Sequence, residues 1–308
     1  MKHYIDPTID CVFKAILGSP ENSHLLHNFL NTILQPASPI IEVTILNPYN
    51  EREFITDKLS IVDIRVVDEA NRHYQIEVQL SSPVYLHKRV IYSWSRLYQS
   101  QLKKGDNVDI LQPLVSIWLL TENVITQSPA FHHHFELYDV ANQTLLTDQC
   151  SIHLLELKKW RKPSTGTLQS QDYWPYFFKE GKHWKQLPKT LDSPEMHQAM
   201  KVLEQFSDKE QDYHLYQARE DYARDQRTRE ALLETERKLK EKALRQVQEA
   251  NLTIATEKAK SEEAIAVEKA KSDEAIAVEK AKSEEAIAVE KAKVEALLKR
   301  LKEAGIKP

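Results

Sequence analysis

Apolar positions in the first hundred residues recur at helical spacing in three segments, each bounded by residues that start or stop helices. The first segment covers about residues 6–17, where Asp6 suits the cap and Pro7 the first turn. The second covers about 21–34. A longer one covers 83–105, ending in two lysines and a glycine. Three helices are therefore expected here.

Other runs alternate between apolar and polar residues, or are continuously apolar, as strands do. Residues 59–67 and 73–80 alternate on either side of a polar turn and together predict a hairpin. Residues 114–120 form an apolar run interrupted only by Ser116, which is typical of a buried central strand. Further strand candidates lie at residues 40–46, 131–140 and 152–157.

From about Ser193 to Ala304 the pattern is helical, and it contains an 11-residue unit that occurs three times, starting at Lys258, Lys269 and Lys280. Eleven residues make almost three turns, so each copy keeps nearly the same facing. We expect a charged, alanine-rich helix, with a weak coiled coil as the alternative. One clear apolar stripe is the expected site of homo-oligomerisation, and it contains Val294, Leu297, Leu298 and Leu301.

Large side chains locate the folded part of the chain. All five tryptophans precede residue 190, and no aromatic residue follows Tyr222. A core requires such side chains, so we expect a folded domain over 1–190, a helical region over 191–250 and the repeat tail over 251–308.

Charge and cysteine content restrict the kind of partner and the cellular location expected for the protein. The net charge is −4, whereas nucleic-acid binders usually carry a basic excess, so DNA contact needs a local patch or a metal. Cys11 and Cys150 are too few for a disulfide framework. The first 17 residues contain Asp6, Asp10 and Lys14 and so are unlike a signal peptide, and no apolar run reaches membrane-spanning length. These features favour a cytoplasmic protein that does not enter membranes.

The expected hairpin gathers polar residues on one face. Asp63 falls close to the level of Glu77, and Gln79 follows on the same face. Facing carboxylates repel unless a cation neutralises them. Oxygen ligands favour Mg²⁺ or Mn²⁺, and such a metal supports phosphodiester hydrolysis. The alternative is that these acids are ordinary residues on the solvent face of an antiparallel hairpin.

These residues also resemble a known signature. Asp63 followed by Glu77, Val78 and Gln79 resembles the D…(D/E)xK motif of the PD-(D/E)XK nuclease superfamily, with glutamine in the lysine position. Asp10 to Lys14 resembles the D-x-x-F-K opening of its Rpn family, the recombination-promoting nucleases or putative transposases. Further matching segments follow in the order of that family, at residues 30–34, 89–92, 101–105, 135–139 and 153–158.

The resemblance covers about residues 3–160 and implies an α/β fold with a mixed central sheet flanked by helices. It implies Mg²⁺-dependent cleavage of DNA, with Mn²⁺ as a substitute. Asp63, Glu77 and the carbonyl of Val78 become the metal ligands. Asp10 corresponds to an additional acid on the first helix.

Glutamine at position 79 leaves a charge to be supplied, because an amide offers only dipoles where lysine offers a cation. Lys14 lies on the same helical face as Asp10 and is one candidate; a surface Asp–Lys pair is the alternative. Lys88, Arg89 and Arg96 are candidate DNA phosphate contacts, or else solvated helix positions.

The run His132 to His134 suggests a metal cluster, but adjacent residues on a strand face opposite sides, so at most two could share an ion.

Met196 and Met200 are the only methionines after Met1, and an internal start there would yield a separate helical product; chance is the alternative.

The sequence thus predicts a metal-dependent DNA endonuclease tied to recombination, mobile elements or defence against foreign DNA. The alternative is a catalytically inactive nuclease fold that binds DNA or a protein and assembles through its helical tail.

Overall fold

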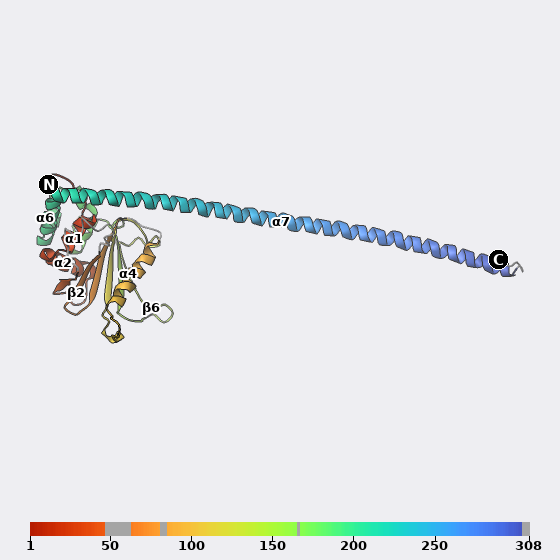
Figure 1. Cartoon of the computed structure of the whole chain (residues 1–308), viewed down its shortest axis with the longest axis horizontal. Coiled ribbons are helices and arrows are strands. Elements are labelled where there is room, and N and C mark those ends of the chain that lie inside the picture. The colour runs from red at the N-terminus through yellow and green to blue at the C-terminus, as the bar shows by residue number, and fades with distance from the viewer. Residues whose placement is uncertain (47–62, 81–84, 165–166, 304–308) are drawn as a thin grey trace. The chain divides into compact units, whose positions relative to one another are not determined.

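The computed structural model describes residues 1–46, 63–80, 85–164 and 167–303, and the chain divides into two compact units, 1–234 and 235–308. Residues 59–62 of the expected first hairpin strand, and Pro83 at the start of the third expected helix, lie outside the described residues. The helices are α1 (Asp10–Leu17), α2 (Ser23–Leu34), α4 (Leu86–Ser100), α5 (Ser170–Glu180), α6 (Pro194–Asp208) and α7 (Glu210–Glu303) (Figure 1).

The main sheet is mixed and has the strand order β1-β2-β3-β4-β8-β5. Its strands are β1 (Val43–Ile45), β2 (Asp63–Asp68), β3 (His73–Gln79), β4 (Leu114–Leu120), β5 (His132–Glu136) and β8 (Cys150–Glu156). The expected hairpin is confirmed, because β2 and β3 pair antiparallel. The β3–β4 and β4–β8 pairs are parallel, and α4 lies in the crossover from β3 to β4.

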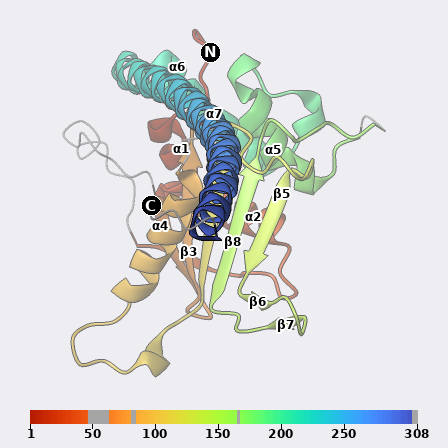
Figure 2. The ribbon, with the colours of Figure 1, turned by 90° about the vertical axis from the view of Figure 1, so that its right-hand side faces the viewer.

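Helices cover both faces of this sheet (Figures 1 and 2). On one face α1, α2, α5 and α6 pack against Ile64, Val66 and Ile76 in a single apolar core. On the other face Leu86 and Val90 of α4 pack against Trp118 of β4. The expected α/β fold, a mixed sheet flanked by helices and followed by a long helix, is confirmed.

Several boundaries differ from the sequence expectation. The first helix begins at Asp10, not near residue 6, because the Asp6 carboxylate accepts hydrogen bonds from the amide and hydroxyl of Thr8 at 2.9 and 2.6 Å and closes a turn. The expected strand over 131–140 is divided into β5 and the two-residue β6 (Tyr138–Asp139), which pairs with β7 (Thr144–Leu145).

The core extends into α6 and the first turns of α7. Met196, Met200 and Leu203 are buried in it, and so is Tyr216. The N-terminus is fastened to the same helices: the amide of Lys2 donates to Asp208 at 2.8 Å. A product starting at Met196 or Met200 would therefore lack the partners that bury these methionines.

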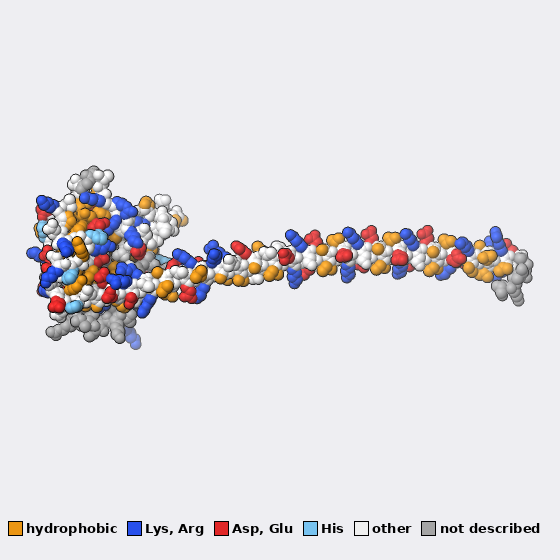
Figure 3. All heavy atoms as spheres, turned by 90° about the horizontal axis from the view of Figure 1, so that it is seen from above, with side chains coloured by type: hydrophobic (Ala, Val, Ile, Leu, Met, Phe, Trp, Pro, Cys, Tyr) orange, Lys and Arg blue, Asp and Glu red, His pale blue; other side chains and the backbone are white. Residues whose placement is uncertain are grey.

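The second unit is the remainder of α7, from residue 235 to Glu303. Its apolar side chains, such as Ile265 and Val267, are exposed and lie among charged ones (Figure 3). Leu297 and Leu298 of the apolar stripe are also exposed. In the described parts of the chain, no helix combines the length and apolar character needed to cross a membrane.

Candidate functional site

The register of the hairpin places Asp63 of β2 directly opposite Glu77 of β3, and Arg65 opposite Gln75. Directly paired positions lie on the same face of a sheet, and here that face is the one covered by α4. Only the backbone of Asp63 belongs to the described structure. The sequence expectation that positions 63 and 77 share one level of the sheet is thus met by the backbone.

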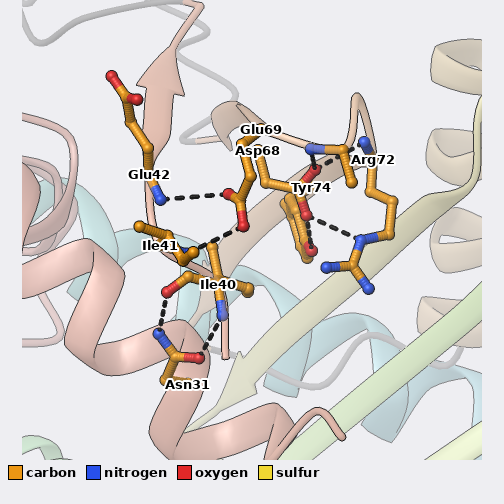
Figure 4. Close-up of polar contacts among 9 residues, drawn as sticks. Asn31, Ile40, Ile41, Glu42, Asp68, Glu69, Arg72 and Tyr74 are labelled. Carbon is orange, nitrogen blue, oxygen red and sulfur yellow. Dashed lines mark hydrogen bonds and ion pairs between the residues drawn. The ribbon is translucent and has the colours of Figure 1, made fainter. Parts of the chain in front are cut away.

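Hydrogen bonds at the turn fix this register (Figure 4). The buried Asp68 carboxylate accepts from the Arg72 guanidinium at 2.8 Å and from the Tyr74 hydroxyl at 2.7 Å. The Glu69 carboxylate accepts from the amides of Ile41 and Glu42, both at 3.1 Å. These contacts join the turn to itself and to the segment before β1, so a slip of β2 against β3 would break them together.

Glu77 is buried, with an exposed fraction of 2%. Its Oε1 accepts a hydrogen bond from the Ser93 hydroxyl of α4 at 3.2 Å and another from the Gln75 amide. Gln75 also donates to Ser93 at 2.7 Å. The alternative, in which Glu77 is an ordinary acid on the solvent face of the hairpin, is wrong, because α4 covers this face and satisfies its polar groups.

Arg89 of α4 reaches two of the predicted site residues. Its Nη1 donates to Oε1 of Gln79 at 2.8 Å, and its Nη2 lies 3.5 Å from Oε2 of Glu77. The guanidinium carbon stands 5.7 Å from the centre of the Trp118 ring, within range of a cation–π contact. The structure therefore brings Glu77, Gln79 and Arg89 together.

A chain of buried polar side chains continues behind Glu77. The Trp118 indole donates to the Ser116 hydroxyl at 2.9 Å, and that hydroxyl donates to Oε1 of Gln75 at 3.4 Å. Sequence reasoning missed Gln75, Ser116 and Ser93 as supports of Glu77. The available signal was the spacing of Arg89 and Ser93, which are four residues apart on one helix and so face the same side.

Asp10 and Lys14 lie on α1, which packs on the other face of the sheet. The Asp10 carboxylate pairs with Arg219 of α7 at 3.5 Å. Burial raises the pKa of Asp10, and the nearby Arg219 lowers it only in part. Lys14 lies beside Gly18. A Cβ added at Gly18 would lie 2.8 Å from the carbonyl oxygen of Lys14 and 3.3 Å from the Ile64 side chain.

The other predicted residues occupy different surroundings. Lys88 and Arg96 are exposed on α4, with the exposed Tyr92 midway between them. Val78 is partly buried against the core on the face opposite α4.

The histidine run divides between two faces, as its alternation predicted. His132 and His134 share a face with His153 of β8: His132 Nε2 lies 2.8 Å from His153 Nδ1, and the His134 ring stacks on His153. His133 lies on the other face, 3.0 Å from Glu156. Burial and the two neighbouring imidazoles lower the pKa of His153 to about 3. Within the described residues, no three His, Cys, Asp or Glu side chains are arranged to hold a metal.

Comparison with known proteins agrees with this architecture. The family model described as PD-(D/E)XK nuclease family transposase matches residues 7–231. That range contains the main sheet, α4 and the ion pair between Asp10 and Arg219. The chain matches no curated protein and no solved structure. Since the matched range covers most of the sequence, the chain belongs to the PD-(D/E)XK nuclease family transposases.

Proposed function

We propose that the protein is a Mg²⁺-dependent DNA endonuclease that acts in recombination, in the movement of mobile elements or in defence against foreign DNA. The observation that carries this proposal is the direct pairing of Asp63 with Glu77 in a chain of this family, with Gln79 two residues further along the same strand.

The proposed metal ligands are Asp63, Glu77 and the carbonyl of Val78. All three offer oxygen, the donor that Mg²⁺ and Mn²⁺ prefer, so the residues fit the ion. When bound, the metal would activate water and offset the charge of the phosphodiester transition state. We propose Asp10 and Lys14 as an additional acid and an additional cation of the reaction; both lie on α1, which packs on the face of the sheet opposite α4.

The chain's own residues would orient the ligands. Gln75 and Ser93 both donate to Oε1 of Glu77, which restricts rotation of the carboxylate and directs Oε2 towards Arg89. A carboxylate held in this way loses little freedom when it binds a cation, and such support from neighbouring groups strengthens metal sites.

For DNA we propose contacts on two surfaces. The first is the exposed side of α4, where Lys88, Tyr92 and Arg96 follow one another at four-residue spacing. The second is a cavity of about 280 Å³ at the carboxyl ends of β3, β4 and β8, where ligands of open α/β sheets commonly bind. Its basic lining residues are Lys158, Lys179, Lys182, His183 and Arg227, and its acidic ones are Asp6, Glu122 and Glu180.

Incubation of supercoiled plasmid with the purified full chain tests the proposal. With Mg²⁺ or Mn²⁺ the plasmid should be nicked or linearised, and a chelator should stop the reaction. Asp63→Ala and Glu77→Gln should each abolish cleavage, while Asp148→Ala, at an exposed aspartate outside the site, should cleave like the original chain. No cleavage with either metal, or undiminished cleavage by Asp63→Ala, would refute the proposal.

A second candidate is a nuclease fold without turnover that binds DNA or a protein. Glutamine in the lysine position favours it, as do the exposed apolar residues of α7, through which we propose that the chain forms homo-oligomers. Binding of DNA that persists in a chelator, with no cleavage in any metal, is the result this candidate requires.

A further inference from the structure

We propose that Arg89 supplies the positive charge that Gln79 cannot, so that a residue of α4 takes over the part of the lysine in the D…(D/E)xK signature. This inference rests on the proposed nuclease function. It changes the role of Arg89 from a contact on the DNA backbone to a group of the reaction centre.

Position is the first support. The two terminal nitrogens of Arg89 meet different partners: Nη1 donates to Gln79 at 2.8 Å, and Nη2 lies 3.5 Å from Glu77. The guanidinium thus sits beside the amide that replaces lysine and also beside the proposed metal ligand. Each terminal nitrogen carries a second N–H, which is suited to a phosphate oxygen.

Charge is the second support. A glutamine amide is neutral, whereas a guanidinium stays protonated at every pH at which proteins fold. The paired acids at positions 63 and 77 need compensation before and after a metal binds, and Arg89 provides one positive charge at Oε2 of Glu77. This compensation does not require lysine on β3.

Rigidity is the third support. On either side of Arg89, Leu86 and Val90 are buried against β4 and anchor α4 to the sheet. The Trp118 ring lies beneath the guanidinium, and the Gln79 oxygen fixes its direction. Groups held in place before the reaction stabilise developing charge more effectively than mobile ones. At the same time, the Arg89 side chain is 38% exposed, so substrate can approach it.

The neighbouring cation Lys88 does not share this arrangement. It is exposed on the outer surface of α4, while Arg89 faces the sheet. Adjacent helical positions do not face each other, so one residue serves the DNA surface and the next serves the site.

Variants that move the positive charge from Arg89 on α4 to position 79 on β3 test the proposal. Arg89→Ala should lower the cleavage rate about 100-fold, the usual loss when one charge-stabilising donor is removed. Arg89→Lys should retain part of the rate, because lysine keeps the charge but cannot bridge both partners. In the Arg89→Ala background, Gln79→Lys should raise the cleavage rate at least about tenfold, since it returns the cation to the strand. Gln79→Lys alone should lower the rate, because two cations then compete for one space.

Matched measurements separate charge from structure. Arg245→Ala removes the same charge from an exposed position of the second unit and should leave the rate unchanged. Mn²⁺ binding, followed by calorimetry, should persist in Arg89→Ala, since the proposed metal ligands remain.

Three results would overturn the inference: full activity of Arg89→Ala, no rescue by Gln79→Lys, or loss of Mn²⁺ binding together with activity in Arg89→Ala. Absence of cleavage by the unmodified chain would instead refute the nuclease function, and the role of Arg89 with it. The two failures are therefore distinguishable.

Discussion

Asp63 and Glu77 are direct partners across the β2–β3 ladder. Like charges at such positions destabilise a sheet unless a cation compensates them. In this chain part of the compensation is built in, because Arg89 lies 3.5 Å from Glu77 and the carboxylate accepts two further hydrogen bonds.

The surroundings of Glu77 predict different consequences for its two simplest variants. Glu77→Ala should abolish cleavage and also lower the free energy of unfolding by about 1–3 kcal/mol, because Gln75 and Ser93 lose their buried acceptor. Glu77→Gln keeps an acceptor of the same shape, so it should lose cleavage at a smaller cost in stability. Urea denaturation of both variants checks this. Equal stability of Glu77→Ala and the unmodified chain would contradict the observed burial.

The exposed side of α4 predicts how DNA binding depends on salt. Lys88→Ala combined with Arg96→Ala should weaken binding to all DNA sequences alike. If both side chains contact phosphates, the slope of log affinity against log salt should fall by about 2, one unit for each contact. Fluorescence anisotropy with a labelled duplex over a salt series measures this. The control is Lys240→Ala with Arg245→Ala, two exposed cations of the second unit, whose slope should not change.

The buried imidazole of His153 predicts acid sensitivity. Its pKa is lowered to about 3, from an ordinary value of 6.5, mainly by burial and then by His134 and His132. Between pH 6.5 and pH 3 the unfolded chain therefore binds a proton at this imidazole, whereas the folded chain does not. The free energy of unfolding should decrease as the pH falls from about 6.5 towards 3. The expected slope for this one group is about 1.4 kcal/mol per pH unit.

Replacement of that imidazole checks the assignment. His153→Gln removes the titrating group and should flatten the loss of stability between pH 6.5 and pH 4.5 relative to the unmodified chain. His197→Gln is the control, since His197 forms an exposed pair with Asp192. Thermal unfolding at a series of pH values provides the comparison, and parallel pH curves for all three proteins would exclude His153 as the source.

The C-terminal stripe, not the repeats, should mediate self-association. Deletion of residues 269–279 rotates the following segment by only about 20° and shortens the helix by about 16 Å. That deletion should leave both oligomeric state and cleavage nearly unchanged. Leu297→Asp with Leu301→Asp should dissociate the assembly, because it places charge on the apolar stripe. Sedimentation of the two variants decides between the sites: dissociation by the deletion alone would make the repeats the interface.

The strands could be predicted from sequence wherever their own side-chain pattern determines them. Residues 114–120 were placed to the residue, because a central strand is apolar on both faces. The hairpin followed from alternation around a polar turn. Helix α5 was not predicted, and it contains Pro175 in its interior, a residue that ordinarily ends helical patterns.

The sequence predicted which residues share one face of the hairpin, but not what covers that face. Alternation places Gln75, Glu77 and Gln79 on one face, but it cannot show whether that face meets water or another helix. The α4 crossover covers it, and this makes Glu77 a buried group with defined partners. The pairing of Asp10 with Arg219 is likewise tertiary, and no local pattern connects positions so far apart in the chain.

The attachment of the N-terminus to α6 and α7 has a consequence for biosynthesis. Asp63, Glu77 and Arg89 all emerge early from the ribosome, within one short stretch of nascent chain. The core they rest on stays open until Met196, Leu203 and Tyr216 have been translated and can dock against α1. A message truncated before that point would release a chain that carries every proposed catalytic residue and still exposes its apolar core, so premature termination should direct it to proteolysis before it meets DNA.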